Sequence, residues 1–281
     1  MTRASRKMTD GRRPFAVITG ASRGIGAEYA RALAARGYDL LMVARDEAAL
    51  HGLASNIPKE GGQTVETAVI DLAEPGAAHR LYLAARSRET QVDLLVNNAG
   101  FGFFGEFVRM SPASLESMLR LHVVTVMETI HLVLPHMIAR RSGGIITVAS
   151  VAGFLPIPYM AVYAATKSFL IAFSQALAEE VRHYGVRVQA CCPGSTATEF
   201  HRRAGAEPHD PTGLQSASEV VHRSLARLGS GPVVLPTGLT GRLVRVVRPL
   251  LPDRLWARLA GWWIRRSLPG ESNLKSPSIQ A

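Results

Sequence analysis

A strand–turn–helix segment with three glycines sets the fold class of this chain. The segment F-A-V-I-T-G-A-S-R-G-I-G spans Phe15 to Gly26. It begins as an apolar strand, and the glycines at Gly20, Gly24 and Gly26 permit a tight turn before a helix. Such a turn lets the backbone approach a pyrophosphate, which the N–H groups and dipole of the helix N-terminus stabilise. The spacing is G-x-x-x-G-x-G and differs from the general dinucleotide fingerprint G-x-G-x-x-G.

Short apolar runs alternate with longer helical segments along most of the chain. We expect strands over 15–19, 40–44, 65–70, 92–96, 144–149, 186–191 and 232–235. We expect helices over 24–36, 46–56, 75–88, 112–140, 159–184 and 216–228. This alternation predicts an α/β fold, a doubly wound parallel sheet of the Rossmann type with crossover helices on both faces. Ser111 and Pro112 are typical of a helix start, and Pro135 is expected to kink that helix or limit its final turns.

The charge of the chain lies at its two ends. Residues 1–14 carry five Lys/Arg and one acidic residue, residues 242–281 carry eight and two, and the part between carries nineteen of each sign. We therefore expect a basic disordered arm over 1–13, one Rossmann domain over 14–238 and a basic C-terminal appendage over 239–281. The neutral body does not suggest a nucleic-acid partner, and any affinity for polyanions belongs to the tails.

Cysteine usage and hydropathy point to a reducing compartment. Cys191 and Cys192 are adjacent, so they cannot form a disulfide framework and do not fit a zinc-site spacing; we expect buried strand residues and no metal site. The N-terminus lacks the apolar stretch of a signal peptide. An uncharged stretch between Arg141 and Lys167 is interrupted by glycines and prolines and is not expected to span a membrane. These observations predict a cytoplasmic protein.

A serine, a tyrosine and a lysine have the spacing of a proton-transfer device. Tyr163 and Lys167 are four residues apart in Y-A-A-T-K, and Ser150 lies thirteen residues before the tyrosine. On a helix, residues at i and i+4 share a face. A lysine ammonium about 4 Å away favours the phenolate by about 4 kcal/mol at an effective dielectric near 20. We therefore expect Lys167 to lower the pKa of Tyr163 from its ordinary value of about 10.

Five motifs in this order give the chain its resemblance to a known family. They are T-G-x-x-x-G-x-G, N-N-A-G at 97–100, Ser150, Y-x-x-x-K and C-P-G-S-T-A-T at 192–198. Over roughly residues 14–235 the chain resembles the short-chain dehydrogenase/reductase family. The resemblance implies hydride transfer between a nicotinamide and a carbonyl carbon. Tyr163 would move the proton of the oxygen, Ser150 would orient that oxygen, and Lys167 would hold the nicotinamide ribose.

The resemblance also implies which residues contact the cofactor. The expected contacts are Gly20, Ser22, Arg23, Gly24, Ile25, Gly26, Arg45, Asp71, Leu72, Asn98, Ala99, Gly100, Tyr163, Lys167, Pro193, Gly194, Thr196 and Thr198. In this family a preference for NAD usually goes with an aspartate at the position of Ala44. Arg45 and Arg23 are instead suited to a 2′-phosphate. We therefore expect NADP(H), with Asp46 as the feature that argues against it.

One position departs from the family pattern. Many relatives carry an asparagine on the long fourth helix that anchors a water leading to the lysine, and His122 occupies that place here. In one interpretation the imidazole replaces the amide as a water holder or proton carrier, which makes His122 a fourth catalytic residue. In the other, His122 is a helix residue satisfied by the backbone. The sequence leaves both open.

The surroundings of the expected site are apolar. Phe101, Phe103 and Phe104 follow N-N-A-G, and Phe154 to Ile157 follow Ser150. These residues suit a small apolar carbonyl compound or alcohol as substrate, or an acyl-type compound. The expected function is an NADP(H)-dependent oxidoreductase; the alternative is a catalytically weak NADPH-binding regulator of the same fold. The resemblance further implies a homodimer or homotetramer paired through the helices over 112–140 and 159–184.

The segment from Leu239 onward repeats arginine every three or four residues among Leu, Val and Trp. All three tryptophans of the protein lie in this segment. A basic amphipathic helix with tryptophan is suited to a membrane surface. The competing interpretation is a helical cap that packs on the body, closes the pocket or joins subunits. Both remain open at this point, and the first would make the protein peripheral to a membrane.

Overall fold

The computed structural model describes residues 12–59, 61–86, 91–200, 204 and 214–266. Its centre is a sheet of seven parallel strands in the order β3-β2-β1-β4-β5-β6-β7. The strands are β1 (Phe15–Thr19), β2 (Asp39–Ala44), β3 (Val65–Val69), β4 (Leu94–Asn97), β5 (Gly143–Val148), β6 (Val186–Cys192) and β7 (Val234–Pro236). The expected doubly wound fold is confirmed, and each expected strand boundary agrees to within two residues. The order reverses between β1 and β4, where ligands bind in folds of this class.

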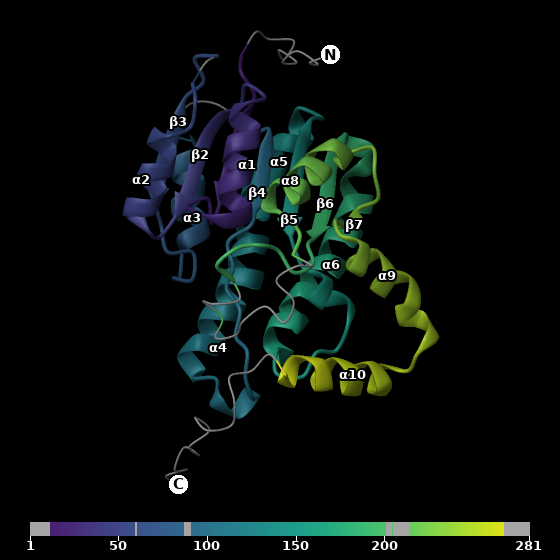
Figure 1. Ribbon diagram of the computed structural model, residues 1–281. Coiled ribbons are helices and arrows are strands. Elements are labelled where there is room, and N and C mark those ends of the chain that lie inside the picture. Colours follow the sequence, from purple (N-terminus) through teal and green to yellow (C-terminus); the bar gives the residue numbers. More distant parts are fainter. Residues whose placement is uncertain (1–11, 60, 87–90, 201–203, 205–213, 267–281) are drawn as a thin grey trace.

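Helices cover both faces of the sheet (Figure 1). They are α1 (Gly24–Ala34), α2 (Glu47–Ser55), α3 (Ala77–Arg86), α4 (Pro112–Leu119), α5 (Thr125–Ala139), α6 (Ala161–Val181), α8 (Ala217–Arg227), α9 (Leu239–Val247) and α10 (Asp253–Arg265). One core layer joins Phe15 and Val17 of β1 to apolar residues of α3, α5 and α6. The other joins Ala16 and Ile18 to α1, α2 and α8. Alternate residues of β1 thus face opposite layers, as the pleat requires.

The helix expected over 112–140 is interrupted. Ser111 caps α4 by accepting a hydrogen bond from the Ser114 N–H (3.2 Å), and Pro112 follows it, as expected. A π-helical segment, η2 (Arg120–Val124), then separates α4 from α5. Pro135 lies inside α5, which nevertheless continues to Ala139. The interruption was not predicted from sequence; π-bulges are frequent at functional sites, and this one contains His122.

Two helical stretches are long and apolar enough to cross a membrane by length and composition alone. They are Pro112–Ala139 and Ala161–Tyr184. Apolar residues of α5 and α6 in these stretches, such as Ile130 and Leu170, belong to a buried core layer on the sheet. A core helix of this kind passes the same test without spanning a bilayer, so the two stretches are weak evidence for a membrane span.

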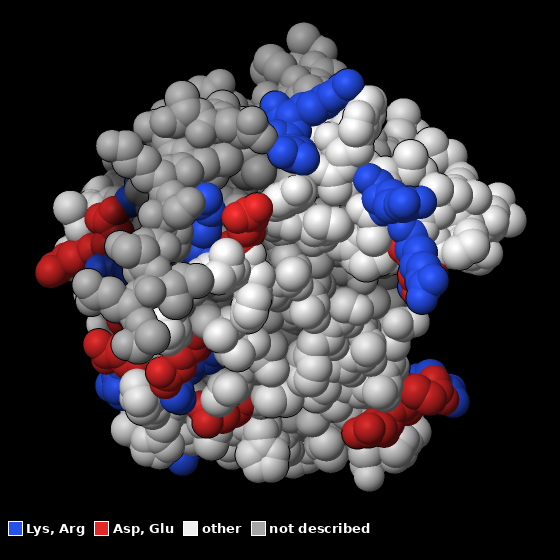
Figure 2. All heavy atoms as spheres, turned by 90° about the horizontal axis from the view of Figure 1, so that it is seen from below, with Lys and Arg blue, Asp and Glu red and all other residues white. Residues whose placement is uncertain are grey.

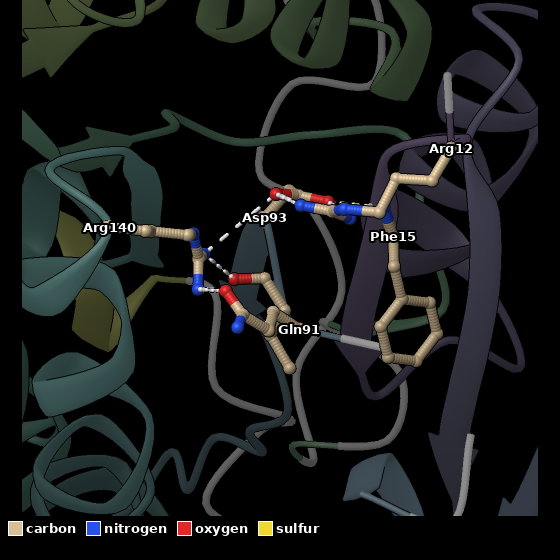
Figure 3. Close-up of polar contacts among 6 residues, drawn as sticks. Arg12, Phe15, Gln91, Asp93 and Arg140 are labelled. Atoms are coloured by element: carbon tan, nitrogen blue, oxygen red, sulfur yellow. Dashed lines mark hydrogen bonds and ion pairs between the residues drawn. The ribbon is translucent and has the colours of Figure 1, made fainter. Parts of the chain in front are cut away.

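A partly buried carboxylate ties three segments together at the amino edge of the sheet (Figure 3). Asp93, just before β4, accepts two hydrogen bonds from Arg12, at 2.7 and 2.9 Å, and one from the Phe15 N–H at 2.8 Å. Arg140, at the end of α5, lies 3.8 Å from the same carboxylate and also donates to the carbonyl of Val92. Arg12 is therefore fixed to the body, although it falls in the expected disordered arm 1–13.

Arg13 is likewise bound, because its guanidinium donates to the carbonyls of Gly61 and Gly62. The rest of the expected arm, residues 1–11, lies outside the described residues. Residues 201–203 and 205–213 of the segment that follows β6, over 195–215, also lie outside the described residues. Its two ends meet where Thr196 pairs with Gln215 in a short parallel bridge.

Candidate active site

The glycine-rich turn after β1 has the close backbone packing that its sequence predicts. Gly20 has φ +63°, a left-handed conformation that glycine adopts without strain. A Cβ on Gly20 would lie 2.8 Å from the Ala99 Cα, and one on Gly26 would collide with the Gly20 carbonyl oxygen. The N-cap residue of α1, Arg23, makes no side-chain capping hydrogen bond. The first N–H groups of α1 thus have no side-chain cap and can receive an anion.

The strand end N-N-A-G holds this turn from the side of β4. Asn98 donates from its side chain to the carbonyls of Thr19 (3.0 Å) and Gly20 (3.2 Å). The backbone N–H groups of Asn98 and Ala99 both donate to the Thr19 hydroxyl, at 2.9 and 3.1 Å. These bonds join β1 and β4 at the point where the strand order reverses. They hold the glycine-rich turn and the N-N-A-G strand end together at this edge of the sheet.

The structure brings Ser150, Tyr163 and Lys167 together. Ser150 follows β5 and caps the short 3-10 helix η3 (Val151–Phe154), accepting from the Ala152 N–H at 3.1 Å. Tyr163 and Lys167 lie on the first turns of α6, and both are buried. The Lys167 amine donates to the Val148 carbonyl at 2.9 Å and lies 5.5 Å from the centre of the Tyr163 ring. All three side chains lie at the carboxyl edge of the sheet.

Burial controls the protonation of the tyrosine and the lysine. It raises the pKa of Tyr163 to about 12, and a hydrogen bond with Ser150 opposes that rise. It lowers the pKa of Lys167 to about 8. The expected lowering of the Tyr163 pKa is not seen, because loss of hydration disfavours the charged form of each group. At neutral pH Tyr163 is therefore protonated.

Both ring nitrogens of His122 have partners in the protein. Nε2 accepts a hydrogen bond from the Phe101 N–H at 3.1 Å, and Nδ1 lies 3.0 Å from the Thr166 hydroxyl. Thr166 donates its own proton to the Tyr163 carbonyl at 2.8 Å, so Nδ1 must carry the proton that His122 donates. Burial and the nearby charge of Lys167 hold the pKa of His122 well below its usual range. The imidazole is therefore neutral, and this geometry favours the backbone-satisfied interpretation over the water holder.

The residues expected at the adenosine end lie at the carboxyl ends of β1, β2 and β3. Arg23 pairs with Asp46, at the start of α2, and with Glu199 at 3.1 Å. Arg45 is exposed and lies 3.9 Å from Asp71. Leu72, after β3, is buried, and its carbonyl accepts from Thr125 at 2.8 Å. The two arginines expected to bind a phosphate therefore already face carboxylates.

The residues expected at the nicotinamide end follow β6. The Pro193 carbonyl accepts from the Val151 N–H at 3.0 Å, which joins this segment to η3 after Ser150. A Cβ on Gly194 would have no neighbour within 4 Å, so there is open space beside it. The Thr196 hydroxyl donates to the Gly194 carbonyl at 2.9 Å. Thr198 lies against Gly24 of the glycine turn. Ser22 and Ile25 of the same turn are half-buried.

An apolar cluster covers Tyr163. Its buried members include Met110, Met118, Met160 and Ile264. Phe101, Phe103 and Phe104 pack against it, as their position after N-N-A-G suggested. A small open pocket of about 10 Å³, room for one water molecule, adjoins the cluster, and its lining is Phe103, Gly105, Phe107, Met110, Met160, Ala161, Val162 and Tyr163. Most of the side chains that line this pocket are apolar, and Tyr163 is one of the lining residues.

Sequence reasoning missed three residues of this site. Thr166 shares the helix face of Tyr163 and Lys167, and its i+3 spacing from the tyrosine could have shown it. The Phe200 ring lies 5.4 Å from the Tyr163 ring, and Ile264 of α10 joins the same cluster. Neither has a local signal, because both come from segments far along the chain. In the part of the chain that the structure describes, no group of three His, Cys, Asp or Glu could hold a metal.

The fold and site together define an oxidoreductase of the dinucleotide-binding α/β class. Residues 14–209 match the family model for short chain dehydrogenases. The chain belongs to the short-chain dehydrogenase family. It is 29% identical over 237 residues to the very-long-chain 3-oxoacyl-CoA reductase of Rattus norvegicus, covering 83% of this chain and 72% of that protein. It is 32% identical over 201 residues to an uncharacterized oxidoreductase of Staphylococcus saprophyticus, covering 69% and 86%.

A solved structure supports the same assignment. The short-chain dehydrogenase from Sphingobium yanoikuyae in complex with NADPH is 30% identical to this chain, with a TM-score of 0.76. The match covers 94% of this chain and 99% of that one. The likeness therefore extends beyond the family segment into the C-terminal helices.

Proposed function

We propose that this protein reduces an apolar ketone to a secondary alcohol with NADPH as the hydride donor, and catalyses the reverse oxidation. The observation that carries the proposal is the convergence of Ser150, Tyr163 and Lys167 at the carboxyl edge of the sheet, beside a small pocket lined mainly by apolar residues. A bound nicotinamide supplies or accepts the hydride at the carbonyl carbon. The protein supplies the proton and the positioning.

The crevice fits a dinucleotide. Side chains at Gly20 and Gly26 would collide with Ala99 and with the Gly20 carbonyl, so the tight turn needs glycine at both positions, and the N-terminus of α1 lacks a side-chain cap. We assign Gly20, Ser22, Gly24, Ile25 and Gly26 to the pyrophosphate end. Further assignments are Asp71 and Leu72 for the adenine, Asn98, Ala99 and Gly100 for the ribose side, and Pro193, Gly194, Thr196 and Thr198 for the nicotinamide.

We assign the 2′-phosphate of NADP(H) to Arg23 and Arg45. No acidic side chain stands at Ala44, and a guanidinium can bind a phosphate with two parallel hydrogen bonds. The solved Sphingobium relative binds NADPH. Asp46 and Glu199, which pair with Arg23, must give up that arginine when a phosphate binds. Their competition sets how strongly NADPH is preferred.

The protonated Tyr163 is suited to act as the general acid in the reduction. Its pKa of about 12 keeps the phenol protonated at neutral pH. Ser150 holds the substrate oxygen beside the phenol, and the proton passes from the Tyr163 hydroxyl to that oxygen. Lys167, buried in the same site, stabilises the phenolate that remains by its positive charge. In the oxidation the proton moves the other way.

The apolar lining indicates the substrate class. Phe103, Phe107 and Met160 line the cavity and offer few hydrogen-bonding groups to a substrate chain. One of the similar proteins reduces a very-long-chain 3-oxoacyl-CoA, as its name states. We infer that a ketone carrying an extended alkyl or acyl chain is preferred over a short polar ketone. The alkyl part would lie among the phenylalanines and methionines.

We propose that His122 is a positioning residue in this reaction. It links the N–H of Phe101, after β4, to Thr166, which in turn bonds the Tyr163 carbonyl. The link ties the cofactor side of the crevice to the catalytic turn of α6. The imidazole ring also lies edge-on to the Tyr163 ring, 5.8 Å between centres. It acts through these contacts and moves no proton.

We further propose a homodimer paired through α5 and α6. The large apolar side chains of Phe169, on α6, and of Leu119, at the end of α4, are partly exposed. Sedimentation equilibrium of the full chain measures the assembly directly. A monomer at all concentrations would contradict this pairing and leave the proposed reaction untouched.

Substitution of Tyr163 by phenylalanine tests the proposed reaction. The full-length Tyr163→Phe variant and the parent are compared on a panel of ketones and 3-oxoacyl thioesters, with NADPH binding measured in parallel. We expect a loss of turnover of about 100-fold or more with NADPH affinity retained. Tyr82→Phe, on α3, serves as a control for the loss of a phenol. An inactive parent that binds NADPH would instead support the regulatory alternative.

A further inference from the structure

The two C-terminal helices have a second face whose large apolar side chains are exposed. On α9, Gly241 is buried against Val151, and on α10, Gly261 lies against Pro158 while Ile264 enters the cluster over Tyr163. These residues form the inner faces of the two helices. The outer faces carry exposed Leu239, Leu243, Val246 and Leu250 near α9, and Leu255, Leu259, Trp262 and Trp263 on α10.

The spacing of these exposed residues follows the helical repeat. Leu239, Leu243 and Val246 stand at i, i+4 and i+7, and Leu255, Leu259 and Trp262 have the same spacing on α10. Residues so spaced share one side of a helix. On the outer side of α9 and its end the exposed fractions lie between 64% and 82%, and on α10 between 40% and 58%. We call the eight residues the outer stripes.

Positive charge surrounds the outer stripes. Residues 239–266 contain seven arginines and a single acidic residue, Asp253. Two of the arginines are anchored to the body, since Arg245 donates to the Val234 carbonyl and Arg248 to the Phe154 carbonyl. Arg266 stacks on the Trp262 ring with its Cζ 3.5 Å from the ring centre. Exposed Leu, Val and Trp framed by arginine match the polar boundary of a bilayer, where apolar groups meet anionic headgroups.

α10 lies close to the apolar cluster that covers Tyr163. α10 runs along the lower edge of Figure 1, and Figure 2 views the molecule from below. Figure 2 shows a wide surface without charged side chains, bordered at its upper right by Lys and Arg. Ile264 of α10 belongs to the cluster that contains Met110 and Met160, which also line the cavity. A partner docked on α10 would therefore lie near the cluster over Tyr163.

We propose that α9 and α10 dock this protein on the surface of a bilayer that contains acidic lipids, with the outer stripes in the headgroup region. The inner faces keep the helices on the body, so docking requires no unfolding of the appendage. A second copy of the chain fits this surface less well. In a two-fold dimer the same patch meets itself, which would bring the arginines of two copies together. Acidic headgroups instead neutralise them.

Vesicle co-sedimentation of the full chain tests the docking, and this readout needs no turnover. The probes are vesicles of phosphatidylcholine alone and of phosphatidylcholine with about one third phosphatidylglycerol, at low and high salt. We expect binding to the acidic vesicles that weakens at high salt. A Leu243→Gln, Val246→Gln, Leu259→Gln variant should bind at least about tenfold more weakly, because each change removes buried apolar area.

A matched control variant shows whether a loss of vesicle binding comes from the outer stripes or from making any part of the surface more polar. Leu83→Gln on α3, another exposed leucine, should leave vesicle binding unchanged. The thermal unfolding of both variants is compared with the parent, to show that the fold is intact. Equal partitioning of the parent and the outer-stripe variant would overturn the proposal. A second outcome would also overturn it: the parent is a dimer and does not bind vesicles, and the outer-stripe variant is a monomer. A second copy of the chain would then occupy the surface.

Discussion

The Nε2 atom of His122 accepts a hydrogen bond from the Phe101 N–H, 3.1 Å away. The bond crosses from the π-helical segment before α5 to the strand end after β4. Gly100 makes the approach possible, since a Cβ there would lie 2.9 Å from the same nitrogen. With Nδ1 facing Thr166 at 3.0 Å, the ring is held from both ends. A histidine that titrates freely could not keep both contacts, because protonated Nε2 would face an N–H donor.

Replacement of His122 by asparagine should change how stability depends on pH in acid, and it should leave the pH dependence of kcat unchanged. The pKa of His122 is lowered in the folded protein, so between about pH 6.5 and the folded pKa only the unfolded chain gains a proton. The parent therefore loses up to about 1.4 kcal/mol of stability per pH unit as the pH falls through this window. Urea unfolding of His122→Asn at several pH values should lack this contribution.

The rate profile distinguishes positioning from proton transfer. We expect His122→Asn to keep the pH dependence of kcat, with Thr166→Val as a second variant that breaks the same link from the other side. If His122→Asn removed an inflection from the profile, the imidazole would be a proton carrier after all.

The buried charge of Lys167 should cost stability at neutral pH. Its folded pKa of about 8 is below the ordinary 10.5, so the unfolded chain binds more protons between these values. Stability of the parent should therefore rise with pH across this window. Burial of the charged amine therefore costs about 3 kcal/mol of stability at neutral pH. A Lys167→Met variant removes this cost but also loses the hydrogen bond to Val148, which offsets about 1 kcal/mol of the gain. Urea unfolding should show the variant more stable at pH 7 and this advantage lost by pH 10.5.

Removal of the Ser150 hydroxyl should shift the pH dependence of alcohol oxidation. Its hydrogen bond lowers the pKa of Tyr163, so Ser150→Ala should raise that pKa further above about 12. Oxidation needs the phenolate, so the rate of alcohol oxidation increases with pH. In the variant this increase should occur at higher pH. We also expect kcat to fall about 100-fold, since the substrate oxygen loses a hydrogen-bond partner. Ser150→Thr, which keeps a hydroxyl, is the control; an unmoved alkaline limb in Ser150→Ala would contradict the contact.

Neutralising Asp46 should strengthen the preference for NADPH. The Asp46 carboxylate pairs with Arg23 and also caps α2 by accepting from the Ala49 N–H at 3.1 Å. Asparagine is an equally good N-cap, so Asp46→Asn removes the charge and keeps the helix start. Because an exposed ion pair is worth up to about 1 kcal/mol, NADPH affinity should rise by up to about fivefold, with NADH unchanged. Calorimetric titration with both cofactors measures this. Equal gains for the two would show that Arg23 does not face the 2′-phosphate.

Loss of the Asp93 carboxylate should destabilise the protein without altering the site. It accepts hydrogen bonds from Arg12 and the Phe15 N–H and faces the partly buried Arg140 (Figure 3). Asp93→Asn should lower the free energy of unfolding by about 2–3 kcal/mol. The half-buried donors of Arg12, Phe15 and Arg140 would then lack the negative charge that they face. kcat/KM should stay unchanged, because the network lies at the amino edge and the site at the carboxyl edge. Arg12→Gln, at a more exposed position, should show a smaller loss in the same denaturation experiment.

Much of the fold could be predicted because its signals are local. The glycines of the first turn, the serine and proline before α4, and the alternation of apolar runs each act within a few residues. The five expected crossover helices outside residues 112–140, and all seven strands, follow from such patterns. The break at η2 could not be predicted, since a π-helical segment depends on what packs against it. Thr166 could have been predicted from the helical repeat, because it lies three residues after Tyr163. Phe200 and Ile264 could not, because they come from distant segments.

The sequence by itself determined the class of fold, the order of its elements and the trio Ser150, Tyr163 and Lys167. Those properties come from steric limits and periodicity along one stretch of chain. Only the tertiary structure decided that Tyr163 is held protonated, that His122 is locked neutral between Phe101 and Thr166, and that α10 reaches the cluster over the tyrosine. These depend on loss of hydration and on contacts between segments far apart in sequence, and neither is set by neighbours along the chain.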